Sequence, residues 1–217
     1  MMEISNLIKQ SLSTDTELER VEIFILHHSI PENTIKCLAS LIAHTDWPYK
    51  ITVLDTSVYP RGLLAKIYNK LIKESTCDYI AFVCSDSEFN QNWLKKFMTY
   101  LKNNKKVGCI VPLTNPPVNK EMDVKTNTGE YEIPASALSM SISLFRKNDI
   151  VCIGGFDEKF YLYGHDVDLL KKMSKKHVFI LDSSITVEHN VGSTTKMVFT
   201  KDELNEVDNY LNSVKDD

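Results

Sequence analysis

The chain of 217 residues is long enough for one large α/β domain or two small ones, and at this length roughly 70% of the unfolded surface can be buried. Its composition, 43% hydrophobic and 25% charged, excludes disorder as the overall state, and the net charge of −4 argues against a protein that binds mainly nucleic-acid phosphates. The five cysteines form no CxxC pair, which excludes a zinc ribbon and makes the reducing cytoplasm the simpler interpretation.

The first 20 residues are polar and contain no apolar core segment, so they predict neither a signal peptide nor a transit peptide. The sequence nowhere approaches the roughly 20 consecutive apolar residues that a membrane-spanning helix needs. We therefore expect no integral membrane segment, and we expect any membrane contact to be peripheral or made through a partner.

In the first half of the chain, short apolar runs alternate with segments of helical periodicity. In chain order, the predicted elements are strand 21–26, helix 31–43, strand 51–54, helix 63–74, strand 79–83, helix 93–101 and strand 107–111. This alternation predicts a single α/β domain with a mostly parallel, Rossmann-like central sheet that is flanked by helices.

The alternation stops at residues 112–134, a polar stretch that holds four of the seven prolines and is predicted to be a loop excursion. The elements predicted beyond it are strand 139–145, helix 168–175, short strands 178–181 and 186–188, and a closing amphipathic helix 201–214. No internal repeat is visible, so one domain is the better prediction.

Carboxylates follow two of the predicted strands. Asp55 comes after the second strand and Asp86 after the third. In open parallel sheets, ligands bind beyond the carboxyl ends of the strands, so these two side chains can point into one crevice. The alternative is that each carboxylate simply closes its strand as a turn residue.

A second group of candidates begins with the pair Gly154-Gly155, which lets the backbone take a tight turn or approach a ligand closely. It continues with His165, Asp166 and Asp168, near the start of a predicted helix. Either aspartate could serve only as a helix N-cap, because exposed amides and the helix dipole favour a carboxylate there.

His189 follows the last short strand, and an imidazole together with a carboxylate suits a divalent cation such as manganese. A lone histidine at a strand end can equally be structural. Cys84 is a soft ligand that matches manganese and magnesium poorly, so we interpret it as a small buried residue.

Several nucleotide-binding and hydrolase folds are excluded by missing motifs. His27, His28 and Ser29 follow the first strand, where a dinucleotide-binding fold needs GxGxxG and a receiver domain needs acidic residues. The chain also contains no GxxxxGK[ST] phosphate loop and no GxSxG elbow, which argues against a P-loop NTPase and an α/β-hydrolase.

Taken in order, the motifs resemble the family-2 glycosyltransferases of the GT-A fold, from about Val21 to Ser193. The matching segments are Leu54-Asp55-Thr56-Ser57, Gly62-Leu63-Leu64-Ala65 with Tyr68-Asn69, Asp78 to Asp86, Trp93-Leu94, Phe145-Arg146, Gly154-Gly155-Phe156-Asp157-Glu158, Gly164 to Leu169, and His189 with Gly192-Ser193. The segment 154–158 is the most specific of them. Two positions depart from the family pattern: Cys84 begins the segment that is an Asp-x-Asp metal motif in the family, and His165 replaces the glutamate of a Glu-Asp pair.

The resemblance implies inverting transfer of a sugar from a nucleotide-diphosphate sugar, a UDP-sugar being favoured, to an acceptor hydroxyl. It implies nucleotide-sugar binding by Asp55, Arg61, Asn69 and Asp86, contacts to the donor or acceptor sugar by Trp93, Gly154, Gly155 and His165, Mn²⁺ or Mg²⁺ binding by Asp86 and His189, and Asp166 as the general base. The acceptor would be a glycan, a lipid-linked sugar or a protein, and the chain could form part of a larger glycosylation assembly. Nucleic acid is not expected as a partner.

The resemblance also divides the single domain into functional parts. These are a polar extension or helix at 1–20, a nucleotide-sugar-binding half at 21–111, the loop excursion at 112–134, a metal and acceptor half at 135–193 and a C-terminal helix at 194–217. Two other classes remain open: a nucleotidyltransferase, and a catalytically inactive module that binds a nucleotide or a glycan.

Overall fold

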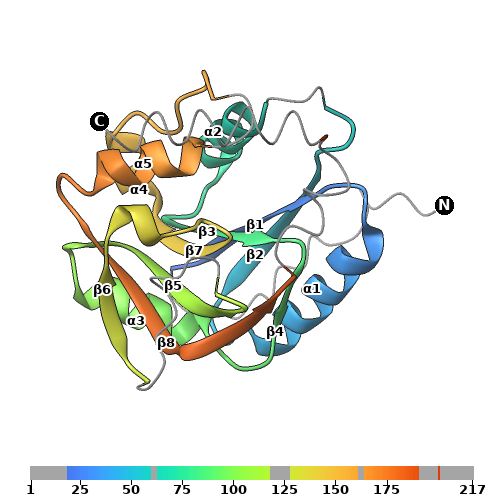
Figure 1. Cartoon of the computed structure of the whole chain (residues 1–217), viewed down its shortest axis with the longest axis horizontal. Helices are drawn as coiled ribbons and strands as arrows, with labels where there is room; N and C mark the ends of the chain where they lie inside the picture. Colours follow the sequence, from blue (N-terminus) through green and yellow to red (C-terminus); the bar gives the residue numbers. More distant parts are fainter. Residues whose placement is uncertain (1–18, 60–62, 118–127, 161–163, 191–199, 201–217) are drawn as a thin grey trace.

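The computed structural model describes residues 19–59, 63–117, 128–160, 164–190 and 200. These residues form one mixed α/β domain in which a central sheet has helices on both faces (Figure 1), so the predicted fold class is confirmed. The predicted helix 201–214, nearly all of the extension 1–20 and the candidate Arg61 lie outside the described residues.

The first half follows the predicted alternation closely. Its elements are β1 (Val21–His27), α1 (Pro31–His44), β2 (Tyr49–Asp55), α2 (Leu64–Glu74) and β3 (Tyr79–Cys84). β1 pairs in parallel with both β2 and β3, and the register places Leu26 opposite Leu54 on one side and opposite Cys84 on the other. The carboxyl ends of these three strands therefore lie along one edge of the sheet.

The second half completes an eight-stranded sheet in the order β2-β1-β3-β7-β5-β8-β4, with β6 paired to β8. Its elements are β4 (Ser87–Phe89), α3 (Leu94–Asn103), β5 (Val107–Asn115), β6 (Glu130–Ile133), the short 3₁₀ helix η3 (Ala135–Ala137), β7 (Ile142–Arg146), α4 (Lys147–Cys152), α5 (His165–Met173) and β8 (Val178–His189). β7 runs antiparallel to both of its neighbours, β3 and β5, whereas β5 and β8 are parallel.

Alternating side chains of the central strands build two hydrophobic cores. In β1, Ile23 and Ile25 face the core that α1 and α3 cover, whereas Phe24 faces the core that α2, α4 and α5 cover. β3 repeats this pattern with Ala81 on one face and Phe82 on the other. Strands buried on both faces explain why the sequence of this half reads as continuous apolar runs.

Two predicted features differ from the structure. The excursion at 112–134 is shorter than predicted, because β5 continues to Asn115 and β6 occupies 130–133. The two short strands 178–181 and 186–188 are one strand, β8, whose polar middle the sequence analysis took for a break. Within the described residues, no helix has both the length and the apolar character to cross a membrane.

Candidate active site

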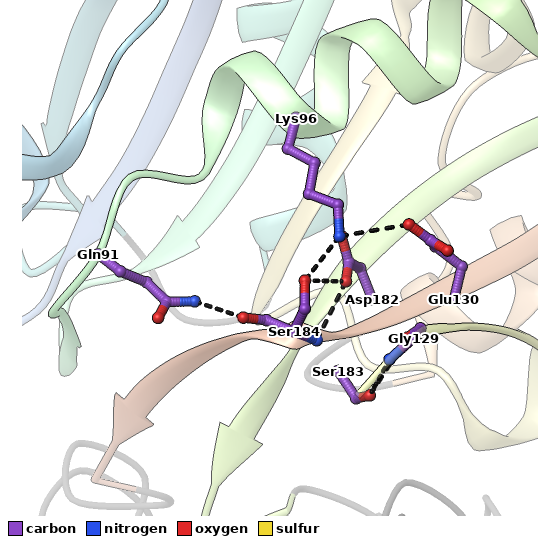
Figure 2. A network of polar contacts seen from close by, with 7 residues as sticks. All are labelled: Gln91, Lys96, Gly129, Glu130, Asp182, Ser183 and Ser184. Carbon is purple, nitrogen blue, oxygen red and sulfur yellow. Dashed lines mark hydrogen bonds and ion pairs between the residues drawn. The ribbon is translucent and has the colours of Figure 1, made fainter. Parts of the chain in front are cut away.

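The polar middle of β8 is a bulge that is anchored by a buried ion pair. β5 advances by one residue, from Pro112 to Leu113, while its partner on β8 advances from Asp182 to Thr186. The Asp182 side chain is fully buried, and its carboxylate lies 2.7 Å from the Lys96 ammonium of α3 (Figure 2). A bulge bends its strand and redirects the residues that follow.

The bulge is held by hydrogen bonds as well as by charge. The backbone amide and hydroxyl of Ser184 donate to Asp182 Oδ1 at 3.1 and 2.7 Å. Lys96 Nζ donates to Ser184 Oγ at 2.6 Å and lies 3.2 Å from Glu130 of β6 (Figure 2). Gln91 donates to the Ser184 carbonyl at 2.7 Å. Burial alone would lower the pKa of Lys96, but the hydrogen bond and charge of Asp182, with those of Glu130, raise it above its ordinary value.

Beyond the bulge, β8 pairs antiparallel with the short strand β4 and brings His189 to the end of β3. His189 lies opposite Ser87, and the Asn190 amide donates to the Asp86 carbonyl at 3.0 Å. His189 Nε2 and Asp86 Oδ1 are 3.2 Å apart, with side chains only 7% and 8% exposed. Asp86 and His189 are the two predicted metal ligands, and the structure brings them into contact.

Cys84 joins this pair. Its sulfur, an Asp86 carboxylate oxygen and a His189 ring nitrogen all lie within 4.8 Å of one another. Burial raises the pKa of the Cys84 thiol, and the carboxylate charges of Asp86 and Asp166 raise it further. Cys84, which is expected from the sequence to be only a small buried residue, is therefore part of the cluster.

The cluster fits a divalent cation. A carboxylate oxygen and an imidazole nitrogen are common ligands of such cations, and here they are adjacent and nearly buried. His189 Nδ1 is also buried, and it has no hydrogen-bond partner among the residues that the structure describes. A buried polar atom without a partner is uncommon in native proteins, and a bound ion is one of the explanations for it.

Asp166 and Asp168 both lie in the first turn of α5, whose N-cap Gly164 has φ 87°. Asp168 pairs with Lys172 at 2.6 Å, and its amide donates to the Gly164 carbonyl at 2.9 Å. Asp166 accepts a hydrogen bond from the Val167 amide at 2.9 Å. The Lys172 ammonium pairs with Asp168, whereas no ion pair of Asp166 is found among the described residues. The structure therefore distinguishes two carboxylates that the sequence left equivalent.

His165 is buried against aromatic rings rather than exposed at a surface. Its ring lies 5.8 Å from Tyr68 and 5.7 Å from Phe156, centroid to centroid. Burial lowers the pKa of His165 although Asp166 raises it, so the imidazole is neutral at neutral pH. Its Nδ1 is buried and has no hydrogen-bond partner within the described part of the chain. Its contact with a sugar stays a prediction.

The Gly-Gly turn is clamped by Asn69 of α2. Asn69 donates to the Phe156 carbonyl at 2.9 Å and accepts from the Phe156 amide at 2.9 Å. Gly154 and Gly155 have φ of 91° and 73°, and a Cβ on Gly155 would lie 2.6 Å from Asn69 Oδ1. The two glycines are therefore required by the turn itself. The Asn69 amide is occupied here, and its role in nucleotide binding stays a prediction, as do the sugar contacts of Gly154 and Gly155.

Asp55 ends β2, and its carboxylate closes a turn as the sequence analysis allowed. It accepts hydrogen bonds from the Ser57 amide at 2.9 Å and the Ser57 hydroxyl at 2.5 Å. Burial alone would raise the pKa of Asp55, but these hydrogen bonds and the charges of His27 and His28 lower it below its ordinary value. The register puts Leu54 and Cys84 on either side of β1, about 10 Å apart.

The prediction that Trp93 contacts a sugar is wrong for this structure. Trp93 is fully buried between Phe89 and Phe97, and its indole donates to Thr45 Oγ1 at 3.3 Å. A depression of about 480 Å³ lies over α3, lined by Asp46, Lys95, Lys96, Thr99, Tyr100, Asn103 and Asn104. None of the predicted site residues lines it.

The sequence matches the profile of glycosyl transferase family 2 over residues 4–156, which is most of the chain. The chain belongs to this family. No match is found among curated protein sequences. Two similar solved structures are GalNAc-T7 with UDP, GalNAc and Mn²⁺ (TM-score 0.62, 12% identity) and the mannosyltransferase PcManGT from Pyrobaculum calidifontis with GDP-Man and Mn²⁺ (TM-score 0.64, 13% identity).

The likeness to these structures, at such low identity, supports the fold. It covers 81% and 82% of this chain, but the chain spans only 44% and 59% of theirs. The family-2 profile ends at residue 156, so Asp166 and His189 lie beyond it and are placed by the fold alone. The clamp by Asn69 and the place of Cys84 in the cluster are not predicted from the sequence. Only the position of Cys84 in the metal-motif segment could have suggested its role.

Proposed function

We propose that this family-2 chain is an inverting glycosyltransferase. It transfers a sugar from a nucleotide-diphosphate sugar, with a UDP-sugar favoured, to an acceptor hydroxyl, assisted by Mn²⁺ or Mg²⁺. The observation that carries the proposal is the contact of 3.2 Å between Asp86 and His189 at the carboxyl end of β3, with the Cys84 sulfur within 4.8 Å of both ligand atoms. UDP and GDP-Man, each with Mn²⁺, in the two structural neighbours support the same class of donor.

The donor would lie along the sheet edge, from β2 to β3. Asp55, ionised and at the end of β2, would accept hydrogen bonds from the nucleoside. Asp86 and His189 would hold the cation, which as a Lewis acid neutralises the charge on the departing diphosphate. The Gly154-Gly155 turn would form the floor near the sugar, with its shape fixed by Asn69.

Asp166 would act as the general base. It takes the proton from the acceptor hydroxyl while that oxygen forms a bond to the anomeric carbon and the bond from this carbon to the diphosphate breaks on the opposite face. Attack from the opposite face inverts the configuration. A positive charge beside Asp166 would stabilise its carboxylate and weaken it as a base. His165, the neighbouring residue, is neutral and therefore does not have this effect.

The functional parts follow from these roles. We assign the nucleotide-sugar half to 21–111 and the metal and acceptor half to 135–193, within one domain. The candidate acceptors remain a glycan, a lipid-linked sugar and a protein. Membership of a larger glycosylation assembly and a cytoplasmic location both stay predictions. A second candidate is a module that binds a nucleotide or a glycan without turnover, which is favoured by the replacement of acidic motif residues by Cys84 and His165.

The test compares Asp166→Asn with the matched control Asp168→Asn in a panel of nucleotide sugars with Mn²⁺, scored for hydrolysis, transfer and thermal shift. Loss of a general base costs roughly 10²–10⁴ in rate, or about 3–5 kcal/mol of barrier. We expect this loss for Asp166→Asn only, with donor binding retained. If Asp166→Asn keeps more than about a tenth of the turnover, Asp166 is not the base. Binding of a nucleotide without turnover by the wild type would favour the inactive module.

A further inference from the structure

The cluster at the end of β3 contains one ligand that does not suit manganese. Cys84 Sγ, Asp86 and His189 offer ligand atoms within 4.8 Å of one another, and the Asp86 to His189 contact is 3.2 Å. Ligands of a tetrahedral cation at 2.0–2.3 Å lie about 3.3–3.8 Å apart. The three side chains therefore need to close by only about 1 Å to share one ion.

Strand pairing holds Cys84 and His189 in place, and Asp86 lies in the tight turn between β3 and β4, where its carbonyl accepts from the Asn190 amide at 3.0 Å. Cys84 ends β3, its amide donates to the Ser141 carbonyl at 2.7 Å, and its own carbonyl accepts from the Cys37 thiol at 3.5 Å. His189 is fixed by its pairing with Ser87 across β4 and β8, downstream of the anchored bulge. Ligands on paired strands form a more precise site than ligands on loops.

The chemistry of this set differs from that of an all-oxygen site. Mn²⁺ and Mg²⁺ prefer carboxylate, carbonyl and water oxygens, whereas zinc and its soft analogues take thiolate, imidazole and carboxylate together. A thiolate, an imidazole and a carboxylate also leave the fourth tetrahedral position open, as in catalytic rather than structural zinc sites.

We propose that Cys84 is a third metal ligand beside Asp86 and His189, and that it makes this site selective for a thiophilic divalent cation of the zinc class over Mn²⁺ and Mg²⁺. The proposal rests on the placement of the cation in the proposed function, and it adds the identity of the ion. It predicts that the same position binds both kinds of cation, but that only the zinc class engages the sulfur.

The test uses the full chain, reduced and free of metal, titrated with Co²⁺ as a spectroscopic substitute for Zn²⁺. A thiolate ligand gives a sulfur-to-cobalt charge-transfer band in the near ultraviolet. We expect this band in the wild type, its loss in Cys84→Ser, and its retention in Cys152→Ser, because Cys152 is the exposed cysteine and lies outside the cluster. Far-ultraviolet circular dichroism and the melting temperature establish that each variant is folded.

Selectivity is measured by competition. Zinc outcompetes manganese at most nitrogen and oxygen sites, so the diagnostic quantity is the change in the ratio of the Zn²⁺ and Mn²⁺ dissociation constants when the thiol is removed. We expect Cys84→Ser to reduce the preference for Zn²⁺ by at least about 10-fold, the lower end of what loss of an outer-shell partner costs. Cys84→Asp should go further, by raising the affinity for Mn²⁺.

The results separate this inference from the proposed function. A Cys84-dependent band supports it even where no nucleotide sugar turns over. Turnover with Mn²⁺ together with a cobalt spectrum that lacks the band, or a band that persists in folded Cys84→Ser, overturns it while leaving the proposed function standing. An unchanged Zn²⁺ to Mn²⁺ ratio in both Cys84 variants also overturns it.

Discussion

β8 carries two acid–base contacts that differ in how completely their polar atoms are used. At the bulge, the buried Asp182 faces the Lys96 ammonium at 2.7 Å and accepts two hydrogen bonds from Ser184. At the end of the strand, His189 Nε2 faces Asp86 at 3.2 Å, while its Nδ1 has no hydrogen-bond partner among the described residues. Both contacts are buried on the acidic side. In the first, each carboxylate oxygen faces a partner, Oδ1 the Ser184 donors and Oδ2 the Lys96 ammonium, and in this sense the first contact is a closed network whereas the second is not.

The difference separates a structural contact from a binding contact. A closed network of charge and hydrogen bonds holds one geometry and gains nothing from a ligand. A buried ring nitrogen that lacks a partner carries a cost in the free protein that a ligand can relieve. We therefore expect the Lys96–Asp182 contact to determine stability and the Asp86–His189 contact to determine ligand binding.

The largest expected effect is the loss of stability in Lys96→Met. This change leaves a fully buried carboxylate without its cation, which in buried pairs costs about 3–5 kcal/mol. We expect about 3 kcal/mol, the lower end of that range, because the Lys96 side chain is 40% exposed. Urea unfolding measures the change, and Lys95→Met, at an exposed neighbouring position on α3, is the control. A loss of stability no greater than that of the control would contradict the structural role of the Lys96–Asp182 contact.

His189→Ala should affect ligand binding far more than stability. Without metal or nucleotide, we expect a change on the order of 1 kcal/mol or less. With a nucleoside diphosphate at 100 times its dissociation constant, the wild type should gain about 2.7 kcal/mol. The Mn²⁺-dependent part of that gain should be missing from the variant. Thermal shifts with Mn²⁺ and with EDTA measure it, and a large loss of stability in the ligand-free variant would mark His189 as structural instead.

The smallest effect concerns alkaline pH. The pKa of Lys96 is raised by Asp182 and Glu130, so its contribution to stability is fully present below the unfolded pKa of about 10.4 and is lost as the pH rises through the folded pKa. The stability difference between the wild type and Lys96→Met should thus be constant from about pH 7 to pH 10 and shrink above that. Urea unfolding across this range measures it, and a difference that already shrinks below pH 9 would contradict the ion pair.

The sequence predicted the first half of the sheet well because β1 and β3 are buried on both faces, so nearly every position in them is apolar and the strands are visible as continuous apolar runs. The prediction failed at β8, because the three consecutive polar residues at 182–184 are typical of a loop. Only the contact of Asp182 with Lys96 of α3 explains why they lie within a strand. The direction of β7 was equally hidden, since local pattern does not record which way a strand enters a sheet.

The candidate site shows the same limit. Asp86 and His189 were paired from the family order of motifs, and the structure brings them together. Trp93 was misplaced because a motif gives a position along the chain but not the face of the sheet on which the side chain lies. The clamp of Asn69 on Phe156 joins residues 87 positions apart, and no local signal carries such a contact.

The clamp by Asn69 restricts how α2 and the turn after α4 can move relative to one another. Asn69 ties α2 to the turn after α4 through both atoms of its amide, and a further hydrogen bond to Glu158 at 3.0 Å reinforces the link. Separating the two segments would break all three hydrogen bonds, each worth about 1 kcal/mol net, so the link disfavours a hinge between them. If the proposed donor binds beside this turn, we expect the turn to keep its shape and any rearrangement on binding to occur outside this link.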